Sequence, residues 1–276
     1  MAISYCTLSQ AQTEAKINNT DGDFQTYYEA VYGQATQRID RLTNGMEFAP
    51  RIMTRYFNGY VPDLQYDVLY LDFPLLSVTS IVINGTNTLT ASDYDLEVFD
   101  GDAANTIWRD DGWTFTDDRR RAIAVTGTWG FRRYYNDGEG WRAVTTMNDA
   151  GGISATDTTV TVTDASQIAE GQMLRIESEF LSVTSKAANT LTIRRGIRGS
   201  TAAIHADTTS VEVWEPEPDI SQAAAMLVSY GYKRRGDYGE AEFQTDLGAT
   251  LRFPPDTPRT VQNIVNKYRR GYARVF

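Results

Sequence analysis

The spacing of hydrophobic residues predicts two helices near the start of the chain. Thr7 and Gln10 fit a capping box, in which each side chain satisfies a free backbone amide of the other residue, and this first helix is predicted to end near Lys16. After the polar run 18–22, hydrophobic residues recur at three- and four-residue steps, which places them on one face of a second helix. These residues are Phe24, Tyr28, Val31, Ala35, Ile39 and Leu42. The pair Asn44-Gly45 predicts the end of this helix, because both residues tolerate a left-handed backbone.

Between residues 67 and 131 the hydrophobic period changes from that of a helix to that of a strand. The alternation predicts strands over 69–73, 78–83, 94–99 and 123–129. Asn84-Gly85 predicts a tight turn after the second of these strands. Pro74 predicts that the first strand ends there or lies at a sheet edge, since proline has no amide hydrogen to donate.

A second β segment follows a polar, glycine-containing stretch. Residues 159–163 alternate strictly between threonine and valine, and 174–176, 180–183, 191–193 and 211–214 complete a set of short strands. Threonine and alanine dominate this segment, and acidic or proline residues lie near both of its ends. We therefore expect an inserted small β-barrel or sandwich module over 145–214.

The pattern returns to helix near the end of the chain. One helix is predicted from Ile220 to about Arg235, with Ala223, Met226, Leu227 and Tyr230 on one side. Thr257 is the predicted N-cap of a last helix, with Pro258 at its first helical position. Val261, Ile264, Val265 and Tyr268 form the hydrophobic stripe of that helix.

The order of elements predicts an α+β fold in which the N- and C-terminal helices form one α-helical bundle. The predicted domains are the N-terminal helices (1–65), a β-rich region (66–144), the inserted module (145–214), and the C-terminal helices with a terminal tail (215–276).

Composition narrows the class of protein without naming it. Among 276 residues, 41% are hydrophobic and 22% are charged, which is typical of a globular chain, and no run approaches the roughly 20 apolar residues of a membrane span. The N-terminus lacks the basic and apolar regions of a secretory signal, and we expect no membrane partner. With a single cysteine no internal disulfide can form, which suits a reducing cytoplasm. The formal net charge of −10 argues against a protein that wraps nucleic acid, although it allows a wall past which DNA slides.

Side chains that could support catalysis are few. His205 is the only histidine, in a run of small residues without a matched serine or cysteine motif, and Cys6 is the only cysteine. Glu177 and Glu179 would share a strand face, as an acid and base pair would, but a solvated strand face is the favoured interpretation.

Metal and cofactor motifs are also missing from the sequence. The acidic residues Asp110, Asp111, Asp117 and Asp118 lack the spacing of a calcium loop, and a surface loop explains them better. There is no phosphate-binding glycine loop, dinucleotide fingerprint or zinc-type spacing. We therefore predict a protein that is not an enzyme and that needs no cofactor or metal.

The last ten residues are basic and aromatic. Lys267, Arg269, Arg270 and Arg274 occur there without an acidic residue. Cations at a helix C-terminus complement the helix dipole, but that explanation covers only the first three. Because aromatic and apolar groups continue to the end, we expect this tail to dock on a partner and become ordered on binding.

Three stretches in a fixed order resemble the head-to-tail connector (adaptor) family of tailed bacteriophages. The first stretch is the segment 5–8 with the helix ending in 38–45. The second is 71–78 with 82–85, Tyr94 and 124–131. The third is 220–235 with 247–248 and the helix ending in 268–270. The segment 195–201 and His205 are similar to the closing motif of a small β module found in various phage structural proteins, where the histidine is structural.

This resemblance implies a structural virion protein at the neck of the particle, made in the host bacterial cytoplasm. It implies a twelve-fold ring of neighbouring adaptor subunits, which joins the portal protein to a head-closure (stopper) or tail-terminator protein. Genomic DNA would pass through the ring without sequence-specific binding. The portal-docking role is transferred only to Tyr268, Arg269, Arg270, Tyr272, Arg274 and Phe276.

Two alternatives belong to other classes of protein. One is a receptor- or carbohydrate-binding virion protein that uses the inserted module. Phe180 is the only aromatic residue in 150–213, which argues against a sugar-stacking surface there. The other is a cell-wall hydrolase that depends on Glu177.

Overall fold

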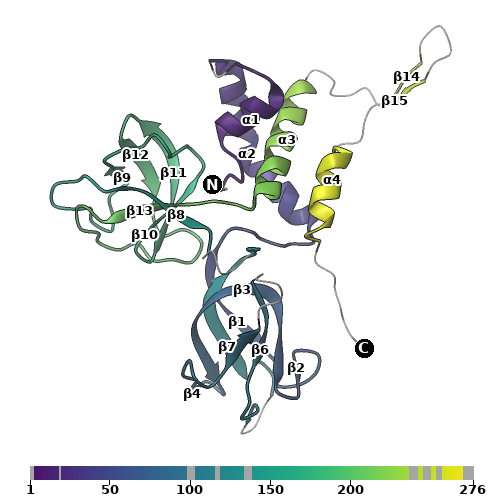
Figure 1. Cartoon of the computed structure of the whole chain (residues 1–276), viewed down its shortest axis with the longest axis vertical. Helices are drawn as coiled ribbons and strands as arrows, with labels where there is room; N and C mark the ends of the chain where they lie inside the picture. The colour runs from purple at the N-terminus through teal and green to yellow at the C-terminus, as the bar shows by residue number, and fades with distance from the viewer. Residues whose placement is uncertain are drawn as a thin grey trace.

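The chain folds into three packed units, which are separate lobes in Figure 1. The computed structural model describes residues 3–18, 20–97, 103–115, 119–133, 139–235, 242–244, 250–252 and 257–269. We call the lobes the helical unit, the sheet unit and the barrel module. The helical unit consists of α1 (Leu8–Ala15), α2 (Gly22–Leu42), α3 (Pro218–Lys233) and α4 (Arg259–Asn266).

Local sequence fixes the ends of these helices. The Thr7 side chain accepts a hydrogen bond from the Gln10 amide at 3.3 Å, and Gln10 Oε1 accepts one from the Thr7 amide at 2.7 Å, which confirms the capping box. Asp21 caps α2 by accepting from the Phe24 amide at 3.1 Å. The prediction for the last helix was wrong by one residue. Its N-cap is Pro258, and Thr257 instead accepts a hydrogen bond from Arg38 at 2.7 Å.

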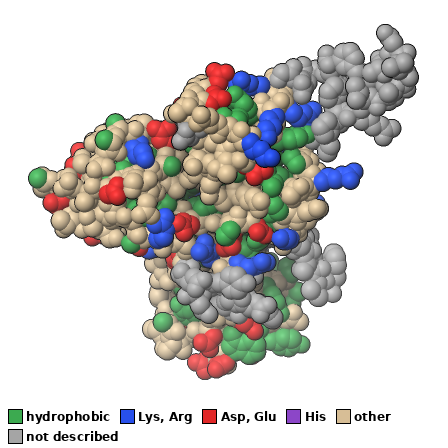
Figure 2. All heavy atoms as spheres, turned by 45° about the horizontal axis from the view of Figure 1, so that its top comes forward, with side chains coloured by type: hydrophobic (Ala, Val, Ile, Leu, Met, Phe, Trp, Pro, Cys, Tyr) green, Lys and Arg blue, Asp and Glu red, His purple; other side chains and the backbone are tan. Residues whose placement is uncertain are grey.

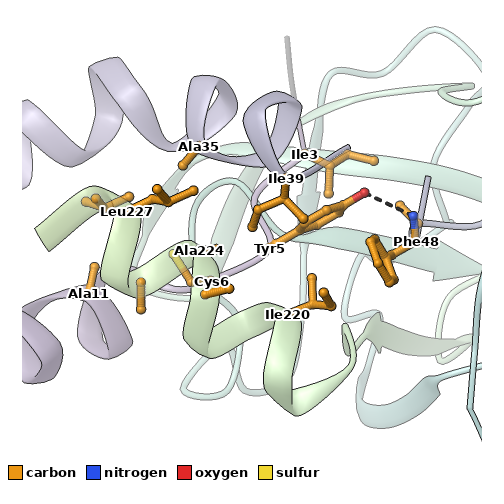
Figure 3. Close-up of a cluster of buried hydrophobic side chains, with 14 of the residues drawn as sticks. Ile3, Tyr5, Cys6, Ala11, Ala35, Ile39, Phe48, Ile220, Ala224 and Leu227 are labelled. Atoms are coloured by element: carbon orange, nitrogen blue, oxygen red, sulfur yellow. Dashed lines mark hydrogen bonds between the residues drawn. The ribbon is translucent and has the colours of Figure 1, made fainter. Parts of the chain in front are cut away.

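The predicted α-helical bundle at the termini is wrong, although the broad α+β description holds. Strands make up 34% of the chain and helices 23%, so antiparallel sheet is the main architecture. The helices pack on a core that they share with other parts of the chain (Figure 3). That core also contains Phe48 from the segment after α2 and Met173, Phe180 and Trp214 from the barrel module. Helical side chains alone therefore do not enclose it.

The sheet unit is a seven-stranded antiparallel sheet with its own hydrophobic core. Its strands are β1 (Arg51–Phe57), β2 (Leu64–Gln65), β3 (Val68–Ile83), β4 (Asn87–Thr88), β5 (Asp95–Glu97), β6 (Ala104–Trp108) and β7 (Ile123–Trp129). The main order is β1-β7-β3-β6-β5, and β2 and β4 pair with β3. The sheet begins at Arg51, a residue within the range 1–65 that was predicted to hold only helices.

Strand β3 continues through Pro74, where the sequence predicted an end or an edge. Its first half pairs with β6 as far as Leu75, and its second half pairs with β7 from Leu75 onward. Pro74 lies at this change of partner, where its carbonyl accepts from the Gly130 amide at 3.1 Å and no amide donor is needed. After β3, Asn84 and Gly85 both have positive φ in the tight turn to β4, as predicted.

The barrel module contains a six-stranded antiparallel sheet whose two ends meet. Its strands are β8 (Trp141–Thr146), β9 (Thr159–Thr161), β10 (Met173–Ile176), β11 (Glu179–Ala187), β12 (Thr190–Arg194) and β13 (Ser210–Trp214). The order is β8-β13-β10-β11-β12-β9. A bridge between Met147 and Val162, with the Asn148 amide donating to the Thr161 carbonyl at 2.9 Å, joins the end strands β8 and β9. The sheet therefore closes around a core of its own, separate from those of the helical unit and the sheet unit.

Two further short strands, β14 (Glu242–Gln244) and β15 (Thr250–Arg252), pair with each other. Within the described part of the chain, no helix has both the length and the apolar character needed to cross a bilayer.

Candidate functional site

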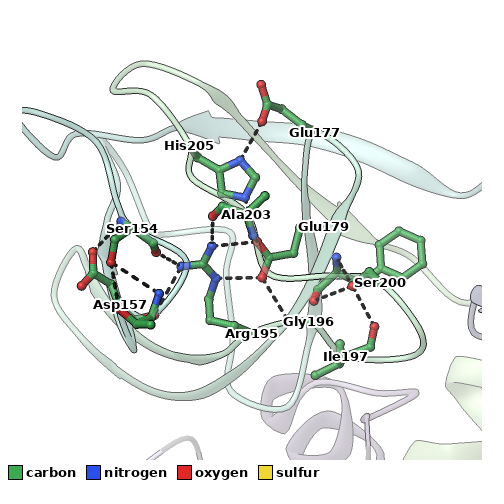
Figure 4. A network of polar contacts seen from close by, with 12 residues as sticks. Ser154, Asp157, Glu177, Glu179, Arg195, Gly196, Ile197, Ser200, Ala203 and His205 are labelled. Carbon is green, nitrogen blue, oxygen red and sulfur yellow. Dashed lines mark hydrogen bonds and ion pairs between the residues drawn. The ribbon is translucent and has the colours of Figure 1, made fainter.

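The histidine and the two glutamates singled out in the sequence lie together in the barrel module (Figure 4). The His205 ring is 1% exposed, and its Nδ1 and Nε2 atoms lie 2.7 Å from Glu177 Oε2 and 2.8 Å from Glu179 Oε2. Arg195 adds a two-pronged contact, in which Nε and Nη2 each donate to one Glu179 oxygen at 2.7 Å. We call this cluster of His205, Glu177, Glu179 and Arg195 the Glu179 network.

Glu179 contradicts the predicted solvated strand face, because its side chain is fully buried. Glu177 instead occupies the turn before β11 with a positive φ, and its side chain remains 60% exposed. Burial alone raises the pKa of Glu179, but hydrogen bonds from Arg195, the Ala203 amide, His205 and the Gly196 amide lower it to about 2. Glu179 is therefore an anion that holds its surroundings together, and it is a poor general acid.

The Glu179 network ties loop 195–205 to strand β11. Besides Glu179, the Arg195 guanidinium donates to the carbonyls of Ser154 at 2.6 Å and Ala203 at 2.5 Å, so it connects three segments. His205 has both ring nitrogens in contact with carboxylates and almost no exposed surface, an arrangement that suits a structural clasp. Arg195 belongs to the segment 195–201 that resembles a closing motif, and an arginine is the usual partner of a buried glutamate charge.

The same loop connects the barrel module to the rest of the molecule through Arg198. Its guanidinium donates to the carbonyls of Pro50 at 2.8 Å and Ala49 at 2.7 Å, and it pairs with Glu47 at 2.6 Å. The Arg198 carbonyl accepts from the Ile52 amide at 2.9 Å, directly at the start of the sheet unit. The loop is therefore the junction at which the three units meet.

A cavity of about 520 Å³ lies beside this junction, lined by residues of the helical unit, of the segment after α2 and of the barrel module. They include Ile3, Tyr5, Asp40, Glu47, Arg194 and Arg198. The Tyr5 hydroxyl donates to Asp40 Oδ1 at 2.7 Å. It also accepts from the Phe48 amide at 3.1 Å, the hydrogen bond drawn in Figure 3. Burial raises the pKa of Asp40 to about 7, although the hydrogen bond from Tyr5 opposes this shift. The charge of the junction therefore changes near neutral pH.

The remaining candidates for chemistry are occupied or inert. Burial raises the pKa of the Cys6 thiol to about 12, so its reactive thiolate form is scarce. Asp110 accepts a hydrogen bond from the Trp108 indole at 2.6 Å, and Asp117 and Asp118 lie outside the described residues. Among the residues that the structure describes, no group of three or more histidine, cysteine, aspartate or glutamate side chains could hold a metal ion.

The predicted docking tail begins at the core of the helical unit. Tyr268 is 6% exposed, and its ring meets Phe48 and Phe131 edge-to-face, with centroids 5.4 Å and 5.5 Å away. The next residue, Arg269, is exposed and donates to Asn44 Oδ1 at 3.4 Å. The other four docking residues, Arg270, Tyr272, Arg274 and Phe276, lie outside the described residues.

Neither the family models nor the curated proteins contain a match to this chain.

Proposed function

We propose that this protein is a head-to-tail adaptor of a tailed bacteriophage. It would assemble with neighbouring copies into a twelve-fold ring, between the portal protein and a head-closure or tail-terminator protein. The observation that carries the proposal is the contrast between Tyr268 and Arg269, one buried in the core and the next exposed. A basic, aromatic tail with such a fixed starting point suits attachment to another protein.

The packing of helix α4 supports this role for the tail. Val261, Ile264 and Val265 are buried in the same core as Tyr268, so the whole hydrophobic stripe of α4 holds the helix against α2 and α3. Because Tyr268 is packed in the core, the point at which the seven residues after Arg269 leave the helical unit is fixed. Four of the seven are arginine or aromatic residues, which supply charge-assisted hydrogen bonds and apolar area.

The order of the resembling stretches also supports the proposal. The first and third stretches supply helices that pack on one shared core, although more than 170 residues separate α2 from α3. The second stretch supplies β3 and β7, which are paired neighbours in the sheet unit. The stretches that resemble the adaptor family therefore form connected parts of the fold.

The chemistry of the barrel module favours a structural role over the alternatives. His205 and Glu179 are buried and already paired, and Phe180, the only aromatic residue of 150–213, is 3% exposed. A sugar-stacking surface needs exposed aromatic rings, and a hydrolase needs an acid and a base that reach the substrate. We therefore propose neither carbohydrate binding by this module nor hydrolysis through Glu177.

The tail is tested by removing residues 270–276 and measuring binding of the subunit to purified portal rings. This truncation retains Tyr268, whereas an end after Lys267 would also remove a core ring and confuse docking with folding. The matched control replaces 270–276 with a glycine-serine segment of equal length. We expect both variants to keep the circular dichroism and melting temperature of the full chain and to lose portal binding. Unchanged binding would contradict docking by the tail.

Electron microscopy of virions tests the function as a whole. A ring of this protein at the portal vertex is the expected result, and a fibre or a peripheral location contradicts the adaptor proposal.

A further inference from the structure

The negative charge of the chain is concentrated in one segment of the sheet unit. Residues 56–111 contain ten acidic residues and one basic residue, Arg109. Their formal charge of −9 accounts for nearly all of the −10 of the chain, since the rest contains 25 basic and 26 acidic residues. Figure 2 shows acidic and hydrophobic side chains side by side at the lower end of the molecule, where the sheet unit lies.

Strand register places a group of these residues on one outer face. Tyr70 of β3 pairs with Thr106 of β6, which pairs with Glu97 of β5. The row beside it runs from Val68 through Trp108 to Asp95. Paired residues of an antiparallel sheet point to the same side, and residues two apart on a strand do as well. These six residues, with Asp110, form what we call the acidic–aromatic face. Asp72, two residues after Tyr70, is already paired with Arg55 of β1.

The opposite face of the same strands is buried. Leu69 and Ile107 are fully buried in the core of the sheet unit, and Leu96 packs against it. The outer face therefore has no role in covering that core, yet Tyr70 is 45% and Trp108 is 40% exposed. Nearby, in the turn between β2 and β3, Tyr66 is 86% exposed.

Large aromatic rings beside carboxylates are typical of surfaces that bind other molecules. Tyrosine and tryptophan contribute most of the energy in many protein interfaces, because they bury large areas at a small entropic cost. Hydrogen bonds hold parts of this face in place. The Trp108 indole donates to Asp110 at 2.6 Å, and the Thr106 hydroxyl donates to Glu97 at 2.9 Å.

The charge decides among the occupants of this face. Nucleic acid and anionic membranes carry the same sign of charge and would be repelled. The 220 residues outside 56–111 have a formal charge of −1, and the segment among them that is both basic and aromatic, 267–276, is the one proposed above to dock on the portal. We propose that the acidic–aromatic face binds a cationic surface of a different protein, one in which arginine or lysine side chains surround apolar groups. In choosing a different protein over a second copy, this inference rests on the proposed function, which assigns segment 267–276 to the portal.

The test uses the full chain and a fluorescein-labelled peptide of repeated Arg-Leu-Arg-Pro units. A peptide in which glutamine replaces every arginine serves as the uncharged probe. Fluorescence anisotropy measures both, in low salt and in physiological salt. One variant combines Asp95→Asn with Glu97→Gln, and another combines Tyr70→Ser with Trp108→Ser. The matched control, Asp23→Asn with Glu29→Gln, removes the same charge from exposed positions on α2.

We expect the arginine peptide to bind the wild-type chain and the α2 control alike, and each face variant to lose about tenfold or more in affinity. The glutamine peptide should bind weakly throughout. Equal losses in the α2 control would show that only total charge matters and would overturn the proposal. It would also be overturned if single-stranded DNA or a chito-oligosaccharide bound the face as tightly as the arginine peptide.

Sedimentation velocity provides a separate arm. Self-association that the face variants abolish would identify a second copy as the occupant and would refute a different partner. Circular dichroism of each variant ensures that a loss of binding reflects the face and not the fold.

Discussion

His205 Nε2 lies 2.8 Å from Glu179 Oε2, and both side chains are buried in the barrel module. Arg195 contacts the same carboxylate from the other side, so one buried anion holds two basic side chains. Removing the Glu179 charge would leave the Arg195 guanidinium buried without a carboxylate partner. The contact therefore makes the folding of the whole loop 195–205 depend on Glu179.

Glu179→Gln is expected to reduce the free energy of unfolding by about 3–5 kcal/mol. The glutamine amide cannot neutralise the charge of Arg195. Its NH₂ group would also point at N–H donors, such as the Ala203 amide, that now donate to the Glu179 carboxylate. Urea unfolding followed by circular dichroism measures the loss. Glu177→Gln is the control, because its side chain is 60% exposed and should change stability by less than about 1 kcal/mol. Equal effects of the two substitutions would contradict a central role for Glu179.

The raised pKa of Asp40 predicts that the free energy of unfolding decreases as the pH rises toward and through neutrality. Its pKa is about 7 in the folded chain and 3.8 for an ordinary aspartate, so the folded state binds the extra proton. The stabilisation is complete below about pH 4 and is lost as the pH rises through about 7, at a cost of up to about 4 kcal/mol. Asp40→Asn should remove this dependence and make the protein more stable than wild type at about pH 9.

Urea unfolding at about pH 5 and about pH 9 checks this prediction. Asp95→Asn, which removes an exposed carboxylate of the sheet unit, is the control and should leave the pH dependence of stability unchanged. If wild type and Asp40→Asn lost stability in parallel between these pH values, a group other than Asp40 would be responsible for the pH dependence.

Much of the fold could be predicted from local signals. The capping box at Thr7, the long α2 and strand β7 follow from residues close together in sequence. Strand β1 was missed, because the segment 51–57 has no clear alternation and is a strand only through its pairing with β7. The bundle was wrong for a related reason, since sequence periodicity does not reveal that Trp214 and Phe48 complete the helical core.

The candidate site shows the same limit. The sequence identified His205, Glu177 and Glu179 as a histidine and two acids, but it did not show which acid is buried. That depends on Arg195, whose guanidinium comes from 16 residues away to meet Glu179. Likewise, the raised pKa of Asp40 arises mainly from burial between segments that are distant in sequence. Contacts of this kind are properties of the fold and not of any motif.

Gly199→Ala is expected to disrupt the junction between the barrel module and the sheet unit. Gly199 has a φ of +86°, and a Cβ atom there would lie 1.9 Å from the Ile52 carbonyl oxygen, so backbone would have to move. Gly85→Ala is the matched control, because Gly85 has a φ of +72° with open space around its Cβ position. Both substitutions incur the left-handed strain of about 1–2 kcal/mol, and only Gly199→Ala adds the clash. Thermal unfolding separates them, and hydrogen exchange should show faster exchange of the Ile52 amide in Gly199→Ala alone.

The contrast between Tyr268 and Arg269 allows folding and docking to be separated by two single substitutions. Tyr268→Ala removes a buried ring that touches Phe48 and Phe131, so we expect a loss of about 3 kcal/mol in the free energy of unfolding. Arg269→Ala removes an exposed side chain with one long hydrogen bond, and its effect on stability should stay within about 0.5 kcal/mol. If the tail docks on the portal, Arg269→Ala should nevertheless weaken binding to portal rings, because the lost cation stands at the root of the docking segment. Chemical unfolding and a portal-binding assay on the same two proteins check both parts. A stable Tyr268→Ala protein would refute its place in the core, and full portal binding by Arg269→Ala would restrict docking to residues 270–276.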